Sequence, residues 1–203
     1  MVLLRHLDTK RLILRTALEL FSKQGYAGSS IRQIARGVGI TESNVYNHFT
    51  SKEEIFIAIL SDFRTRTIGE KVLSDDLLND LVVPEKFLKN FASKLINHWN
   101  SPDERMFIRL LLMEQFTKIG SLELSVTDYL NELRSICKMI FSEMIKHNVI
   151  KKLDSEFLAE EFTSQLFFIR TELMSLDDSS NFKVVLDKVN RHIEFFWNAV
   201  RII

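Results

Sequence analysis

The sequence predicts an all-α fold, and three observations support this. Only 6 glycines and 2 prolines occur in 203 residues, so tight turns are scarce. Apolar residues recur at steps of three and four along most of the chain, as they do on one face of an α-helix. No alternating pattern is long enough to predict a strand instead. We expect about nine helices, with a three-helix N-terminal domain followed by a larger helical bundle.

The first three predicted helices are short and well delimited. Apolar spacing predicts a helix over residues 8–24, ended by Gly25. Ser30 with Gln33 three residues later forms a capping box that starts the second helix, and the glycines at positions 37 and 39 end it. Thr41 caps a third helix that reaches residue 47 or 48. Between the second and third helices only a turn of three or four residues remains.

The rest of the chain divides at the next capping signals. Ser51 with Glu54 starts a fourth helix, which we expect over residues 52–72. Residues 74–83 are the least periodic stretch, and Pro84 suits the first turn of a new helix. A further helix is predicted from Pro84, marked by Phe87, Phe91 and Leu95, and others over 102–118, 122–146 and 155–176, with a last helix after residue 180. We therefore expect a first domain over residues 1–50 and a second over 51–203, with the fourth helix connecting them.

The net charge of zero conceals an asymmetry. Residues 1–66 carry 10 Lys and Arg against 6 Asp and Glu, and residues 67–203 carry 17 against 21. A small basic excess at one end is compatible with a polyanionic partner there, although on charge alone a solvated basic face is the better explanation.

Two short helices joined by a glycine-containing turn are typical of the DNA-binding helix-turn-helix, whose second helix enters the major groove. In the third helix Val45 and Phe49 are four residues apart and face inward. Glu42, Ser43, Tyr46 and Asn47 are then left to face outward. Serine and asparagine can hydrogen-bond base edges, and a tyrosine hydroxyl more often reaches a phosphate.

Residues 12–60 resemble the N-terminal domain of the TetR family of transcriptional regulators. The resemblance is carried by the segments Ala17-Leu18-Glu19-Leu20-Phe21, Gly25-Tyr26, Ser29-Ser30-Ile31-Arg32-Gln33-Ile34-Ala35, Gly39-Ile40-Thr41, Val45-Tyr46-Asn47-His48-Phe49 and Ser51-Lys52-Glu53. It implies a homodimeric repressor on a palindromic operator in double-stranded DNA. A C-terminal helical domain would bind a small-molecule effector and weaken DNA binding.

The candidate DNA-binding residues combine the outward face of the third helix, the amide-rich starts of the second and fourth helices, and the matching family positions. They are Ser29, Ser30, Arg32, Thr41, Glu42, Ser43, Asn44, Tyr46, Asn47, His48 and Lys52. Ser30 also serves as a cap, and His48 is as readily a packed imidazole as a phosphate contact. Ser43, Asn44 and Asn47 depart from the residues frequent in the family, so the operator sequence does not follow.

The last two predicted helices are apolar on more than one side. A helix of this kind needs more than one packing partner, so we expect the domain core on one face and a two-fold mate on the other. The candidate dimer interface is Leu158, Phe162, Leu166, Ile169, Leu173, Phe182, Val185, Val189, Ile193 and Phe196.

Aromatic and methionine side chains in the second domain, interspersed with polar ones, fit either a core or a pocket for a largely hydrophobic effector. The candidate effector-binding residues are Phe63, Trp99, Phe107, Met113, Glu114, Phe116, Tyr129, Phe141, Phe168 and Arg170.

Catalysis is not expected. The chain has no inward Glu-x-x-His pairs for a di-metal bundle, no Cys-x-x-Cys, no glycine-rich phosphate loop and no G-x-S-x-G. Cys137 is read as a small buried hydrophobe. We expect no metal and no cofactor. With no signal segment, no apolar run of eighteen residues and one cysteine, a cytoplasmic protein without a membrane partner is expected. A helical carrier of small molecules that does not bind DNA remains the alternative.

Overall fold

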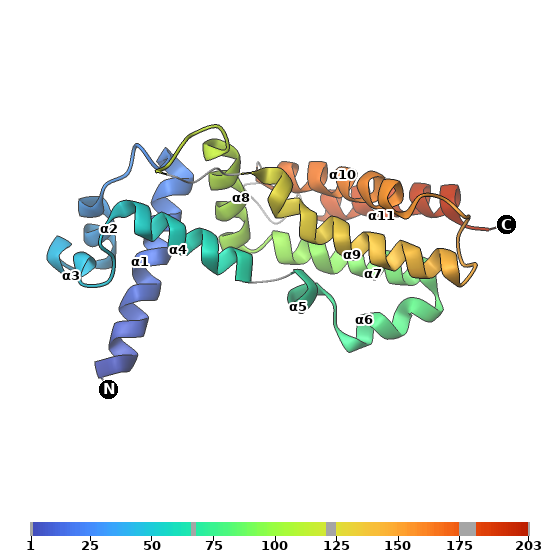
Figure 1. Cartoon of the computed structure of the whole chain (residues 1–203), viewed down its shortest axis with the longest axis horizontal. Coiled ribbons are helices and arrows are strands. Elements are labelled where there is room, and N and C mark those ends of the chain that lie inside the picture. Colours follow the sequence, from blue (N-terminus) through green and yellow to red (C-terminus); the bar gives the residue numbers. More distant parts are fainter. Residues whose placement is uncertain (1, 66–67, 121–124, 175–181, 203) are drawn as a thin grey trace. The chain divides into compact units, whose positions relative to one another are not determined.

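A computed structural model of the chain describes residues 2–65, 68–120, 125–174 and 182–202 (Figure 1). The structure is all-α, with eleven α-helices and no strand among these residues. None of the described helices is both long and apolar enough to cross a membrane. The chain packs into two compact units, one formed by Met1–Arg66 with Pro102–Val126 and the other by Thr67–Ser101 with Thr127–Ile203.

The first unit contains α1 (Val2–Gln24), α2 (Ile31–Val38), α3 (Glu42–Tyr46), α4 (Lys52–Thr65) and α8 (Pro102–Glu114). Helix α1 packs against α2, α4 and α8. Its buried residues Ile13, Ala17 and Phe21 recur at intervals of four, which place them on one face of the helix. The packing therefore joins α4 and α8 to the N-terminal helices. The compact unit thus includes residues beyond position 50, where we expect the DNA-binding domain to end.

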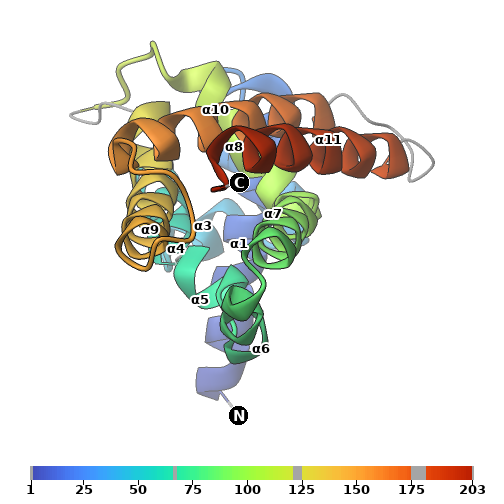
Figure 2. The ribbon, with the colours of Figure 1, turned by 90° about the vertical axis from the view of Figure 1, so that its right-hand side faces the viewer.

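The second unit contains α5 (Ile68–Val72), α6 (Asp75–Asn79), the 3₁₀ helix η1 (Asp80–Val82), α7 (Pro84–Trp99), α9 (Val126–Lys146), α10 (Ser155–Leu173) and α11 (Phe182–Val200). Helices α10 and α11 run side by side (Figure 2). Helix α7 packs against both. At the centre the ring of Phe162 lies 5.4 Å from that of Phe141 and 5.0 Å from that of Phe196, between centroids.

Some predicted boundaries are wrong. Helix α1 begins at Val2, not near residue 8. Residues 74–83, the least periodic stretch of the sequence, contain α6, because Ser74 caps this helix through the Leu77 amide and two aspartates follow in the first turn. That arrangement stabilises even a short helix. The helix starting at Pro102 ends at Glu114, not near residue 118. Residues 66–67 within the predicted fourth helix lie outside the described part of the chain.

The predicted dimer-interface stripe also needs correction. Nine of its ten residues are buried in the core of the second unit by the chain itself, and Phe182 is half-buried against that core. The set is Leu158, Phe162, Leu166, Ile169, Leu173, Phe182, Val185, Val189, Ile193 and Phe196. The apolar side chains that α10 and α11 leave exposed lie off this stripe, and they are Phe157, Phe168, Val184 and Phe195.

Candidate nucleic-acid interface

The α2–turn–α3 segment is held by hydrogen bonds that the sequence encodes locally. The Gln33 amide donates to Ser30 Oγ, and the Ser30 amide donates to Gln33 Oε1 at 2.8 Å, which completes the predicted capping box. Gly39 ends α2 with φ at +77°, a conformation that favours glycine. The Asn44 amide then donates to Thr41 Oγ1 and starts α3. The two helices lie next to each other (Figure 1).

Helix α3 separates its apolar and polar sides. Val45 is fully buried and Phe49, just beyond the helix, is 2% exposed. The remaining side chains from Thr41 to Asn47 are all exposed, and Tyr46 has 52% of its surface free. These are the predicted candidates Thr41, Glu42, Ser43, Asn44, Tyr46 and Asn47. The polar side of a helix anchored at Val45 is therefore open to a partner.

A groove of about 490 Å³ lies between the start of α2 and the start of α3. It is lined by the predicted candidates Ser30 and Arg32 and by Arg36, which is not among those candidates. Both arginines are exposed and lie one helical turn apart. The signal for Arg36 was its spacing of four from Arg32, which puts both guanidinium groups on the same face of α2.

Lys52 has a structural role in the same region. Its Nζ donates to the carbonyl oxygens of Tyr26 at 2.8 Å and Ser29 at 2.7 Å, and lies 4.1 Å from the centroid of the Tyr26 ring. Burial lowers the pKa of Lys52. The ammonium thus ties the start of α4 to the loop that precedes α2. Its predicted contact with phosphate stays a prediction.

Two other predicted residues are less accessible. Ser29 is 4% exposed and its hydroxyl donates to the Gly25 carbonyl at 2.9 Å, so it holds the loop and is not part of the exposed surface. His48 is half-buried.

Glu114 supports this loop from a distant part of the sequence. It was predicted to bind an effector, but it is 6% exposed and its Oε1 accepts the Tyr26 amide at 2.8 Å. The contact joins residues 88 positions apart. No local pattern encodes such a pairing. Glu114 therefore helps to position the helix-turn-helix.

The other candidate effector residues do not gather in one place. Phe63 and Phe107 stack in the first unit with centroids 4.0 Å apart. Met113 and Phe116 belong to that unit and are exposed, whereas Trp99, Phe141 and Arg170 are buried in the second unit and Phe168 is exposed on it. The side chain of Tyr129 lies outside the described part. The guanidinium carbon of Arg170 lies 4.6 Å from the centroid of the Trp99 ring, so these two residues form a cation–π pair.

Within the described residues no group of three or more His, Cys, Asp or Glu side chains is placed to hold a metal ion. Burial raises the pKa of the Cys137 thiol far above its usual range, so the reactive thiolate is disfavoured at neutral pH.

Comparison with known sequences agrees with this geometry. Residues 13–59 match the family described as "Bacterial regulatory proteins, tetR family". The chain is 28% identical over 113 residues, 56% of its length, to the HTH-type transcriptional regulator SrpR of Pseudomonas putida, of which the match covers 50%. It is 33% identical over 164 residues, 80% of its length, to the uncharacterized HTH-type transcriptional regulator YuxN of Bacillus subtilis, of which 51% is covered. The chain thus spans about half the length of these curated relatives.

Solved structures show the same fold along nearly the whole chain. A putative TetR-family transcriptional regulator from Mesorhizobium loti has a TM-score of 0.68 at 20% identity, covering 98% of this chain and 99% of that one. AibR, solved in complex with isovaleryl coenzyme A and operator DNA, has a TM-score of 0.66 at 20% identity, covering 90% of this chain and 96% of that one. At these identities the likeness concerns the fold.

Proposed function

Because the chain belongs to the TetR family of bacterial transcriptional regulators, we propose that it is a homodimeric repressor that binds a palindromic operator and is released by a small, largely hydrophobic effector. The observation that carries the proposal is the exposed polar side of α3, anchored on its other side by Val45. The major groove of DNA, about 12 Å wide, admits an exposed α-helix. Operator DNA would place the protein in the cytoplasm.

The side chains suggest a division of labour on DNA. Ser43 and Asn47 can donate to and accept from base edges, whereas Tyr46 and the α2 arginines suit phosphate oxygens. In this proposal residues 1–50 bind DNA and residues 51–203 sense the effector and dimerise. Helix α4 connects them, because it starts at Lys52 beside the interface and ends at residue 65.

The exposed apolar side chains of α10 and α11 support the dimer. Phe157, Phe168, Val184 and Phe195 have more than half of their surface free, and they lie on two helices that run side by side (Figure 2). An apolar face of this kind on a pair of helices suits a two-fold four-helix contact. Dimerisation would present two copies of α3 about 34 to 36 Å apart for successive half-sites.

For the effector, the pair formed by Trp99 and Arg170 is the most suggestive feature. Both side chains are fully buried in a core that is otherwise mostly apolar. The Trp99 indole Nε1 has no hydrogen-bond acceptor among the described residues. A buried donor without an acceptor is costly, so an effector oxygen beside it would be stabilised. Loss of effector-induced thermal stabilisation in Trp99→Phe is the corresponding test.

Replacing Arg36 by glutamine should weaken binding to operator and non-operator DNA alike. Each phosphate contact contributes about 0.9 to the slope of log affinity against log salt concentration, so the slope should fall by about that amount in Arg36→Gln. Fluorescence anisotropy across a salt series measures it. Lys146→Gln, an exposed charge loss in the second unit, is the control and should keep the full slope. An unchanged slope in Arg36→Gln would show that this residue does not contact phosphate. A wild-type protein without affinity for DNA would instead favour the alternative, a helical carrier of small molecules.

A further inference from the structure

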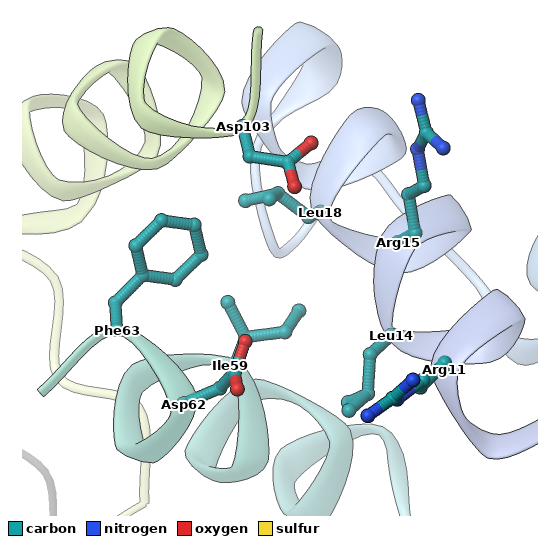
Figure 3. A pocket seen from close by; sticks show the side chains of 8 residues that line it. All are labelled: Arg11, Leu14, Arg15, Leu18, Ile59, Asp62, Phe63 and Asp103. Carbon is teal, nitrogen blue, oxygen red and sulfur yellow. The ribbon is translucent and has the colours of Figure 1, made fainter. Parts of the chain in front are cut away.

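A pocket of about 450 Å³ lies within the first unit (Figure 3), and it shares no lining residue with the α2–α3 groove. Its lining comes from α1, α4 and the first turn of α8: Arg11, Leu14, Arg15, Leu18, Ile59, Asp62, Phe63 and Asp103. This volume is within the range of small-molecule sites. All lining residues belong to one compact unit, so the pocket does not depend on the second unit.

The floor of the pocket is apolar and rigid. Leu14 and Leu18 are one turn apart on α1, and Ile59 and Phe63 are one turn apart on α4, so the two pairs face each other across the pocket (Figure 3). Leu18, Ile59 and Phe63 are buried. Phe63 is also held by its stacking on Phe107 at 4.0 Å between centroids. A fixed apolar floor of this kind can accept an aryl or short alkyl group without paying to order its own side chains.

The charged side chains at the edge of the pocket differ in the interactions that they already make within the chain. Arg11 and Arg15 are exposed, and neither has a carboxylate within ion-pair distance in the described part of the chain. Glu19, one turn beyond Arg15, is already bonded to Lys23 at 2.6 Å. Asp62 and Asp103 are half-buried and each interacts with other residues of the chain. Arg11 and Arg15 are therefore the lining charges that have no carboxylate at ion-pair distance among the described residues.

We propose that this pocket binds an amphiphilic monocarboxylate, with its apolar body on the floor and its carboxylate against Arg11 and Arg15. Guanidinium groups match the geometry of a carboxylate and bind it with charge-assisted hydrogen bonds.

The location gives such a ligand a route to the DNA interface. Helix α1 packs against α2 and α4, and Lys10 Nζ of α1 lies 5.2 Å from the ring centroid of Phe49, which follows α3. A ligand between α1 and α4 would change the affinity for DNA if it bound the DNA-bound and DNA-free arrangements of these helices with different affinities. This regulatory consequence rests on the proposed function, whereas binding of the acid does not.

Titration calorimetry of the full chain without DNA tests the site. The probes are phenylbutyrate, phenylbutylamine and phenylbutanol, which share an aryl-alkyl body and differ in charge. We expect phenylbutyrate to bind with a Kd of about 1 mM or tighter, and the amine and the alcohol to bind more weakly. The variant carrying both Arg11→Gln and Arg15→Gln should lose about tenfold in affinity for the acid.

Two further variants separate the site from general effects. Lys118→Gln removes an exposed charge of the same unit outside both the pocket and the α2–α3 groove and should leave acid binding unchanged. Leu14→Trp places a large ring at a half-buried position in the pocket and should abolish binding while thermal unfolding still shows a folded protein. Tighter binding of the amine than of the acid, or wild-type affinity in the double arginine variant, would overturn the proposal. DNA affinity measured with and without phenylbutyrate is a separate readout: a wild-type protein that binds the acid but no DNA would refute the proposed function and leave the site intact.

Discussion

Replacing Phe195 by glutamate is expected to convert the proposed dimer into a monomer and to lower operator affinity by about 100-fold or more, because the two linked half-site contacts become independent. Phe195 has 76% of its surface exposed in the single chain. In a two-fold contact the same patch of each subunit meets its copy. The new carboxylate would be buried in the groove between α10 and α11, which is also lined by Glu161 and Arg191. Even where Arg191 pairs with it, removing a carboxylate from water into an apolar contact is costly.

Sedimentation equilibrium and operator titration measure the two effects. The matched control is Phe116→Glu, which introduces the same charge at a phenylalanine that is 92% exposed but lies in the first unit. That variant should remain dimeric. A dimer that persists in Phe195→Glu, with unchanged operator affinity, would show that α11 is not in the interface.

Truncation of Phe162 to alanine should lower the free energy of unfolding by about 3 to 5 kcal/mol. The ring is fully buried and its centroid lies 6.5 Å from that of Phe91 on α7 and 5.5 Å from that of His192 on α11, in addition to its contacts with Phe141 and Phe196. Helices α7, α9 and α11 therefore all contact this ring of α10. Removing it leaves a cavity that rigid helices cannot close.

Urea denaturation followed by circular dichroism checks this expectation. Met139→Ala, at an α9 position 57% exposed, is the control and should stay within about 0.5 kcal/mol of wild type. A loss below about 1 kcal/mol in Phe162→Ala would mean that the core is not centred on this residue.

The helices could be predicted to the extent that their signals are local. Ser30 and Thr41 cap α2 and α3 as the sequence indicates, because a cap involves residues only a few positions apart. The burial of Val45 and the exposure of the polar side of α3 follow from helical periodicity in the same way. Ser74 shows that the same reasoning applied to residues 74–83 would have found α6, since its cap and two aspartates are equally local.

Contacts between distant segments could not be predicted from the sequence. The bond from the Tyr26 amide to Glu114 and the stacking of Phe63 on Phe107 depend on how α8 packs against the N-terminal helices. The choice of face on α10 and α11 failed for a related reason. Both helices are apolar on two sides, and periodicity alone does not say which side α7 and α9 cover. Phe162 lies on the covered side and Phe195 on the free one.

Selection of bound duplexes from a random DNA pool, carried out with wild type, Ser43→Ala and Asn47→Ala, tests most directly whether α3 reads the operator. The exposed positions of these two side chains predict that wild type enriches an inverted repeat whose half-site centres are about one helical turn or a multiple apart. Each variant should relax the preference at a symmetric pair of positions, because a lost base contact costs about 1 to 3 kcal/mol against the wrong base. Enrichment of no common sequence by wild type, or of an identical sequence by all three proteins, would contradict the assignment of α3 as the recognition helix.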